Sequence, residues 1–326
     1  MSITPLKILV TSVSKKVPLV RELKKALNRV CEENIIVGAD AEFDCVAKHF
    51  VDDFWQMPQL SELSDDELIN YLQQAGINGI IPTRDGELMF FATRKQLLKK
   101  HNINLMLAPE NAVQICLDKK LFSEQLIRQN FSVIPAVLPS EIEQLDCTSY
   151  VVKERFGAGS QSILIDVKKQ AAIEHAKQLD SAIIQPFIEG DEYSIDVFFS
   201  RNSNCKGVVV RRRDLVINGE SQITSTVYEP AIAELCNSVA KHLKLTGHAV
   251  FQVIKTLDGA VHIIELNSRF GGASTLSIAA GLDSFYWFAL ETMGESIDEH
   301  GLIYPDKSSF TGLRQIRYAV DEIVEI

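Results

Sequence analysis

The sequence HIIELNSRFGG, at residues 262–272, sets a carboxylate, a carboxamide and a guanidinium two residues apart. Side chains of a β-strand alternate between its two faces, so we expect Glu265, Asn267 and Arg269 on one face. Carboxylate and amide oxygens are hard ligands that suit Mg²⁺, and an arginine beside them is placed to hold phosphate oxygens. The segment therefore indicates nucleotide chemistry, although a strand that ends in a solvated Glu–Arg pair before a glycine turn also explains the pattern.

The composition is that of an ordinary folded protein with room for two or three domains: 326 residues, 46% of them hydrophobic and 23% charged. A formal net charge of −10 argues against a protein whose main role is to grip nucleic acid or an anionic membrane. The N-terminus lacks the apolar core of a signal peptide, and no apolar run is long enough to span a bilayer. We therefore expect a cytoplasmic protein without nucleic-acid or membrane partners.

Cysteine and histidine form no metal motif in this sequence. The six cysteines are scattered without a CxxC pair, and the seven histidines include no HExxH motif. We expect reduced, mostly buried thiols and no transition-metal chemistry.

The first hundred residues alternate strand-like runs, at 7–13, 34–40 and 79–83, with helical patterns near 17–30 and 65–75. Such alternation predicts parallel strands joined by crossover helices, which is a Rossmann-like lobe. The turn after the first strand reads TSVSKK and lacks the GxGxxG motif of a dinucleotide site. An NAD enzyme is therefore disfavoured.

The remainder of the chain predicts two α+β lobes. We expect, in chain order, a strand at 150–156, a glycine-bearing segment at 157–163, a helix near 168–179, a strand that enters the segment 185–200, a β-rich run at 193–199, a helix near 229–243, and a helical tract after Thr275.

Lys153 lies inside the apolar strand YVVKERF, directly before the glycine-bearing segment. A lysine in this position can bridge phosphates while the amides of the loop close over them. No Walker motif of the form GxxxxGK[ST] occurs, and a surface lysine beside an ordinary turn explains the pattern as well.

Three consecutive arginines occur in the run VVVRRRD. If this run is a strand, Arg211 and Arg213 lie on one face and Arg212 lies on the other. The pair can face a site that binds anions, or the three arginines can form an exposed basic strand edge.

Taken together, these residues resemble the ATP-grasp superfamily, and more closely its carbamoyl-phosphate-synthetase-like and carboxylate–amine ligase branch. The resemblance implies an ATP-grasp fold with a Rossmann-like domain at 1–108, a small α+β lobe at 109–186 and a large α+β lobe at 187–326, the two lobes clasping ATP. It runs along the whole chain in order: PTRDGEL at 82–88, Lys119, VVKERFGAGSQSI at 151–163, QPFIEGDEYSIDV at 185–197, Gln252, and IIELNSRFGG at 263–272.

The resemblance also implies a nucleotide site. Lys119 and Lys153 match the two lysines that bind phosphate, and Glu192 matches the carboxylate that holds the ribose. The loop over the triphosphate matches Gly157, Ala158, Gly159 and Ser160, and the hinge that reads adenine matches Gln185, Pro186, Phe187 and Ile188. The family usually has Glu where this chain has Gln185, and Gln can still accept a hydrogen bond from the adenine amino group.

Gln252, Glu265 and Asn267 match the magnesium ligands of the family, at a site that can also take Mn²⁺. Arg269 matches the residue that steadies the transferred phosphoryl group. Arg211 and Arg213 match arginines that face the active site.

The activity implied by the resemblance is ATP-dependent ligation of two small molecules, and a homodimer is compatible with it. A carboxylate attacks the γ-phosphate of Mg·ATP to give an acyl-phosphate, and an amine then displaces phosphate. Two alternatives stay open: activation of bicarbonate, as in carbamoyl-phosphate synthesis, and an ATP-binding sensor without turnover. Four residues of the PTRDGEL segment either border the substrate pocket or cap a turn: Pro82, Thr83, Asp85 and Glu87.

Overall fold

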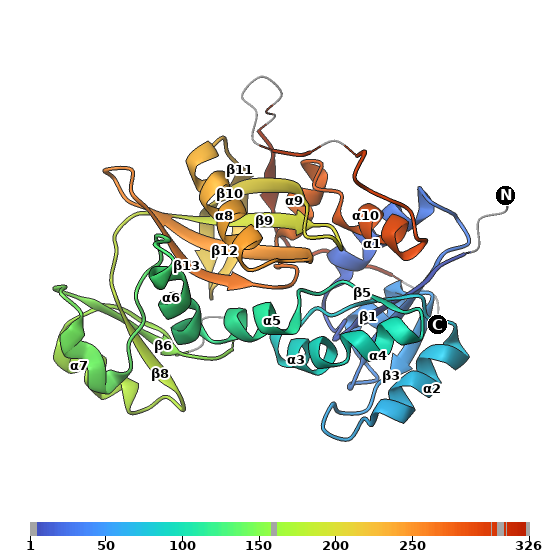
Figure 1. The fold of residues 1–326 in the computed structure, drawn as a ribbon, viewed down its shortest axis with the longest axis horizontal. Coiled ribbons are helices and arrows are strands. Elements are labelled where there is room, and N and C mark those ends of the chain that lie inside the picture. Colours follow the sequence, from blue (N-terminus) through green and yellow to red (C-terminus); the bar gives the residue numbers. More distant parts are fainter. Residues whose placement is uncertain (1–4, 158–161, 301, 305–309, 311, 324–326) are drawn as a thin grey trace.

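Three β-sheets, one in each of three lobes, organise the computed structural model of the chain (Figure 1). The structure describes residues 5–157, 162–300, 302–304, 310 and 312–323. Within these ranges, no helix combines the length and the apolar character that crossing a bilayer requires. The mixture of one parallel and two antiparallel sheets confirms the predicted α/β and α+β fold class.

The N-terminal lobe is a parallel sheet with crossover helices. Its strands are β1 (Lys7–Thr11), β2 (Ile35–Asp40), β3 (Asp53–Gln56), β4 (Gly79–Ile81) and β5 (Asn104–Leu105), in the order β3-β2-β1-β4-β5. Its helices are α1 (Val17–Asn28), the 3₁₀ turn η1 (Val46–Phe50), α2 (Asp65–Ala75), α3 (Asp85–Thr93) and α4 (Lys95–Lys100). The predicted Rossmann-like alternation is confirmed, whereas β3, β5, α3 and α4 were not predicted, because such short segments carry little periodicity.

The large lobe is a six-stranded antiparallel sheet in the order β13-β12-β9-β10-β11-β14. Its strands are β9 (Asp191–Phe199), β10 (Cys205–Ile217), β11 (Glu220–Thr226), β12 (Gly247–Lys255), β13 (Val261–Asn267) and β14 (Arg314–Ile316). Its helices are α8 (Pro230–His242), α9 (Ser274–Ala279) and α10 (Ser284–Thr292). The predicted helix near 229–243 is confirmed. The helical tract after Thr275 is correct for α9 and α10 but wrong for β14, a three-residue strand that forms only by pairing with β11.

The small lobe is a three-stranded sheet in the order β7-β6-β8, covered by one helix. Its elements are the 3₁₀ turn η2 (Pro139–Gln144), β6 (Tyr150–Glu154), β7 (Leu164–Val167), α7 (Lys169–Ala176) and β8 (Ala182–Pro186). The predicted strand that enters 185–200 is confirmed as β8, and the predicted β-rich run at 193–199 is confirmed within β9, which belongs to a different sheet. The chain turns between them at Gly190, where a Cβ atom would lie 2.4 Å from the backbone oxygen of Lys255.

We expect Gly190→Ala to lower the free energy of unfolding by about 1–3 kcal/mol, because the added methyl group meets backbone that cannot move aside easily. Gly86→Ala is the matched control, since its Cβ atom would come no closer than 3.7 Å to the Arg84 side chain. Urea unfolding of the two variants measures the difference. Equal stability of both variants would contradict the close approach at Gly190.

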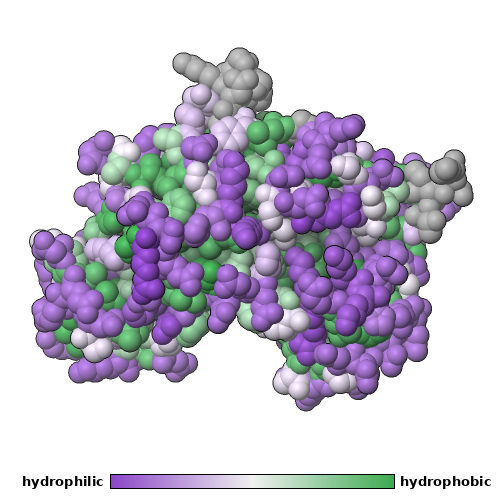
Figure 2. Space-filling model, viewed as in Figure 1, coloured by the Kyte–Doolittle hydropathy of each residue, from purple (hydrophilic) through white to green (hydrophobic). Residues whose placement is uncertain are grey.

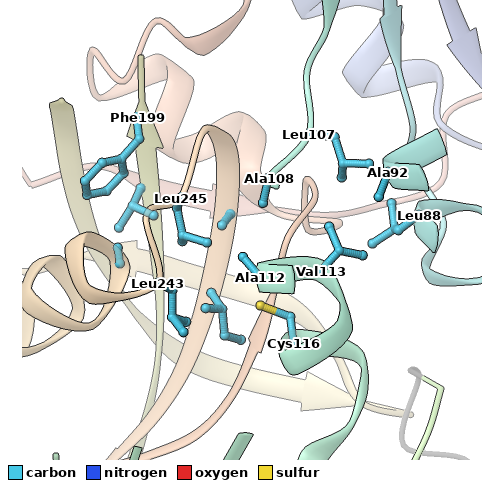
Figure 3. Packing of buried hydrophobic residues seen from close by; sticks show 14 of the residues in the cluster. Leu88, Ala92, Leu107, Ala108, Ala112, Val113, Cys116, Phe199, Leu243 and Leu245 are labelled. Atoms are coloured by element: carbon cyan, nitrogen blue, oxygen red, sulfur yellow. The ribbon is translucent and has the colours of Figure 1, made fainter. Parts of the chain in front are cut away.

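The N-terminal and large lobes share a continuous apolar core, shown in Figure 3. Helix α5 (Glu110–Leu117) packs between them: Val113 and Cys116 lie close to Leu88 of α3 on one side and to Leu243 and Leu245 of the large lobe on the other. Helix α6 (Lys119–Arg128) adds Phe122 and Leu126 to the same core. The small lobe has a separate core, so the fold holds the N-terminal and large lobes together and attaches the small lobe beside them. The domain boundaries at 108 and 186 remain predictions.

Candidate active site

One face of the large sheet carries a row of polar side chains across four neighbouring strands. The strand registers place Gln252 opposite both Glu265 and Ser194, and Ser194 opposite Arg211. The other face is apolar and packs against α8. Because side chains two residues apart share a face, the polar face also includes Glu192, Asp196, Arg213, His248 and Asn267.

Glu265 has a cation and an amide beside it. The Nδ2 atom of Asn267 donates to Glu265 Oε1 at 3.2 Å, and Lys153 Nζ of the small lobe lies 3.9 Å from Glu265 Oε2. Burial alone would raise the pKa of Glu265, but Lys153 and Lys119 bring it below its ordinary value. Burial lowers the pKa of Lys153. Lys153 is only 9% exposed, so the alternative of a surface lysine beside a turn is wrong.

The donor set around Glu265 fits a hard cation. Glu265 supplies a carboxylate, and Gln252 and Asn267 on the same face supply amide oxygens, which are ligands of the kind that Mg²⁺ prefers. In the part of the chain that the structure describes, no group of three or more His, Cys, Asp or Glu is placed to hold a metal. A cation at this face would therefore depend on the amide oxygens and on oxygens from a substrate.

Arg269 joins this face to the N-terminal lobe. Its Nε and Nη2 atoms donate to the two carboxylate oxygens of Asp85, the first residue of α3, at 2.8 and 2.7 Å. β13 ends at Asn267, so Arg269 lies just beyond the strand, yet its Nη2 still lies 3.5 Å from Asn267 Oδ1. The Glu265 and Arg269 side chains are each 16% exposed, so the alternative of a solvated Glu–Arg pair is wrong.

Arg211 is buried in an ionic network on the same face. Its side chain is 2% exposed, and Nε donates to Asp196 Oδ2 at 2.7 Å and to Ser277 Oγ at 3.0 Å. The other oxygen of Asp196 lies 3.0 Å from His248 Nε2. Burial would raise the pKa of Asp196, but Arg211 and His248 lower it well below its usual range. β10 lies between β9 and β11, so the alternative of an exposed basic edge is wrong for Arg211.

Arg213 and Arg212 follow the predicted alternation. Arg213 Nη1 donates to Glu192 Oε2 at 2.7 Å, which places Arg213 beside the predicted ribose carboxylate. Arg212 points to the other face, where its Nε donates to Asp214 Oδ1 at 2.7 Å.

The predicted hinge connects the small and large lobes. Gln185, the penultimate residue of β8, is 3% exposed and its Nε2 atom lies 3.3 Å from the backbone oxygen of Ile134. Phe187 N donates to Ser149 O at 3.0 Å, and Pro186, Phe187 and Ile188 are half-buried.

The predicted phosphate loop is anchored at its beginning. Lys119 Nζ donates to the backbone oxygen of Gly157 at 2.7 Å. Asp118, which caps α6, accepts two hydrogen bonds from Arg155 at 2.7 and 2.6 Å and so ties that helix to the end of β6. Ala158, Gly159 and Ser160 lie outside the described residues.

The turn-capping role considered for the PTRDGEL segment is confirmed for Glu87. Glu87 is fully buried and accepts hydrogen bonds from Thr83 N at 2.6 Å and Arg84 N at 3.0 Å, so it closes the turn before α3. Asp85 instead points to Arg269 and borders the site. Sequence reasoning missed the partnership of Asp85 with Arg269, since 184 positions separate the two residues.

Two further polar groups near the site were missed as well. His248 is buried beside Asp196, and Lys16 lies half-buried beyond the end of β1. The only sequence signal for His248 was a polar residue among apolar ones in a strand, and for Lys16 it was a lysine in the turn after the first strand.

Two family models match the chain. The model described as "ATP-grasp in the biosynthetic pathway with Ter operon" matches residues 178–309, and the model described as "PylC-like, N-terminal domain" matches residues 8–106. No curated protein matches the sequence.

Solved structures share the fold at low sequence identity. A biotin carboxylase from Campylobacter jejuni has a TM-score of 0.71 at 14% identity, covering 89% of this chain and 71% of that chain. An N5-carboxyaminoimidazole synthetase from Staphylococcus aureus, complexed with ADP, has a TM-score of 0.68 at 17% identity, covering 91% and 80%. An L-amino acid ligase from Bacillus licheniformis has a TM-score of 0.68 at 17% identity, covering 93% and 78%. The chain therefore matches an ATP-grasp family model over residues 178–309 and a PylC-like N-terminal model over residues 8–106, and it shares the fold of these solved structures.

Proposed function

We propose that this chain is an ATP-dependent ligase that activates a substrate carboxylate as an acyl-phosphate and couples it to an amine. The observation that carries the proposal is the meeting of all three lobes around Glu265. Lys153 comes from the small lobe, Glu265 and Asn267 from the large sheet, and Arg269 reaches Asp85 of the N-terminal lobe. The L-amino acid ligase and the N5-carboxyaminoimidazole synthetase with this fold support the proposal.

In this proposal the nucleotide lies between the small and large lobes. Lys119 and Lys153 hold its phosphates, the backbone of residues 185–188 reads adenine, and Glu192 holds the ribose after it exchanges its contact with Arg213. The segment 157–160 covers the phosphates. Gln252, Glu265 and Asn267 hold Mg²⁺, which when bound neutralises charge on the phosphate oxygens.

The reaction is a phosphoryl transfer followed by a displacement. A carboxylate oxygen of the acid bonds to the γ-phosphorus as the bond to ADP breaks, and the amine then attacks the carbonyl carbon and releases phosphate and a proton. Repulsion between the anionic acid and the nucleotide is the main obstacle to the first step. Arg269 and Arg213 offset that repulsion from the polar face, and Arg211 lies buried beneath it in its ion pair with Asp196.

The cell compartment and the partners belong to the same proposal. The partners are a small acid and a small amine, and a homodimer remains a prediction. All six cysteines are free thiols, which fits the reducing cytoplasm where ATP is made.

A matrix of carboxylic acids against amines tests the proposed reaction. Phosphate release is measured with Mg·ATP, and mass spectrometry identifies the products. We expect ADP, phosphate and an amide with at least one pair. ADP release with bicarbonate and no organic acid would favour carbamoyl-phosphate-type chemistry instead. ATP binding without ADP release for any pair of acid and amine would favour an ATP-binding sensor without turnover.

Lys153→Ala is expected to weaken ATP binding by about tenfold to a hundredfold, the range for loss of a hydrogen bond to a charged group. Titration calorimetry with Mg·ATP measures the change. Lys177→Ala is the matched control, because Lys177 is an exposed lysine of the same lobe, at the end of α7. Unchanged affinity in Lys153→Ala would contradict the phosphate role.

A further inference from the structure

The carboxyl ends of β1 and β4 meet beside the proposed reaction site. In the order β3-β2-β1-β4-β5, the strands β2 and β3 that follow β1 lie on one side of it, and β4 and β5 lie on the other side. The strand order therefore reverses between β1 and β4, which makes the crevice between these two strands the switch point of the sheet. Ligands of open parallel sheets bind in such crevices. Ser12 follows β1 and donates through Oγ to Glu87 Oε2 at 2.7 Å, which links the turn after β1 to α3 beyond β4.

The turn after β1 holds its backbone in an unusual conformation. Ser12 and Ser14 have φ angles of 47° and 33°, a left-handed region that residues other than glycine rarely adopt. Ser14 N donates to Asp40 Oδ2 at 3.0 Å, which anchors the turn to the end of β2. Within this turn, Lys16 Nζ donates to the backbone oxygen of Ser12 at 2.9 Å.

Lys16 lacks a partner of opposite charge among the described residues. It is half-buried, and Glu87 and Asp40 act on it through space without a hydrogen bond to it. Glu87 is already engaged by Thr83, Arg84 and Ser12. Holding a cation partly out of water is costly unless an anion compensates it.

Other cations are close to this lysine. The Ser12–Glu87 hydrogen bond brings the turn that holds Lys16 to the start of α3, where Asp85 pairs with Arg269. Arg269 and Arg84 both repel the charge of Lys16. Arg269 is paired with Asp85, whereas Arg84 is exposed with its guanidinium over Gly86. Lys16 is therefore a cation without a direct ion pair among the described residues, in the neighbourhood of the arginine that we assign to phosphoryl transfer. Figure 2 shows the surface hollowed between the N-terminal lobe and the small lobe, with hydrophilic residues around the hollow.

We propose that Lys16 binds a substrate carboxylate other than the one that is activated. One of the two substrates is then an amino acid or a dicarboxylic acid. A carboxylate fits better than a phosphate ester, because Glu87 and Asp40 are near enough to act on the site and would repel a second negative charge. Lys16 is a specificity residue in this proposal, which rests on the proposed ligase function.

Matched pairs of substrates test the subsite. The amines are the twenty L-amino acids, each compared with its C-terminal amide, and the acids are dicarboxylates such as glutarate, each compared with its mono-amide. We expect kcat/KM to favour the carboxylate member of one series by about tenfold or more, the effect of a charge-assisted hydrogen bond. The series that shows the preference identifies which substrate carries the group.

Two variants separate the subsite from a general effect on the lobe. In Lys16→Gln the preference for the carboxylate member is expected to fall to about one, with the KM for ATP unchanged. Lys15→Gln is the matched control, because Lys15 is the adjacent exposed lysine, and it should keep the preference of the unmodified protein. A preference that persists in Lys16→Gln, or product formation with no preference in either series, would overturn the subsite while leaving the ligase function standing.

Absence of product with every pair would instead count against the ligase function. In that case the carboxylate subsite is tested by titration calorimetry, which measures the binding of the same matched substrates in the presence of Mg·ADP. Binding of a carboxylate member that Lys16→Gln abolishes and Lys15→Gln retains would support it, and failure of every member to bind would refute it.

Discussion

Glu265→Ala is expected to reduce metal-dependent turnover by at least about a thousandfold, because a metal that stabilises transferring charge contributes several kcal/mol to catalysis. Glu265 is the one carboxylate among the three residues proposed to hold the cation, and the amides of Gln252 and Asn267 carry no charge to replace it. The variant also leaves Lys153 without the carboxylate 3.9 Å away. Loss of the proposed metal ligand and loss of the carboxylate beside Lys153 both act on the phosphoryl transfer from ATP.

The fold should survive Glu265→Ala, since the apolar face of β13 remains packed through Ile263 and Leu266. Circular dichroism and the unfolding temperature check this point, and Glu33→Ala, at an exposed glutamate of the N-terminal lobe, is the control for turnover. The assay uses the acid and amine found in the substrate matrix, with Mg²⁺ varied. A well-folded Glu265→Ala protein with unmodified turnover would remove the metal assignment.

Asp196→Ala is expected to lower the free energy of unfolding by about 3–5 kcal/mol, because it leaves a buried charge without its partner. Asp196 is fully buried and accepts hydrogen bonds from Arg211 at 2.7 Å and from Ser277 at 2.8 Å. Removing the carboxylate leaves the buried Arg211 guanidinium without its anionic partner. Its Nη1 atom already has no hydrogen-bond partner among the described residues in the intact protein.

Two comparisons isolate the charge effect in this network. Glu143→Ala removes an ion pair with Lys169 whose carboxylate side chain is 78% exposed, and we expect a loss below about 1 kcal/mol. The double variant Asp196→Ala/Arg211→Met removes both charges, so it should be more stable than Asp196→Ala alone. Thermal and urea unfolding measure all three. A double variant less stable than Asp196→Ala would show that Arg211 stabilises the fold without its carboxylate.

Local sequence patterns predicted the strands that carry the polar face of the large sheet. The spacing of Glu265 and Asn267 placed both on one side of a strand, and the structure confirms this through their hydrogen bond. The same reasoning placed Arg211 and Arg213 together and Arg212 opposite. Alternation succeeds here because it depends only on the backbone of one strand.

Contacts between distant segments could not be read in the same way. Asp85 and Arg269 belong to different lobes, and nothing local in either segment indicates the other. β14 has no pattern of its own and exists as a strand because it pairs with β11. These features arise from tertiary packing, and their residue types are compatible with several local structures.

Transfer of an oxygen atom from acid to phosphate tests the central claim most directly. The protein is incubated with Mg·ATP, the amine, and the acid labelled with ¹⁸O in its carboxylate, and the released phosphate is analysed by mass spectrometry. Activation as an acyl-phosphate predicts one ¹⁸O atom in each phosphate formed together with the amide. Amide formation with unlabelled phosphate, or with AMP and pyrophosphate, would contradict it.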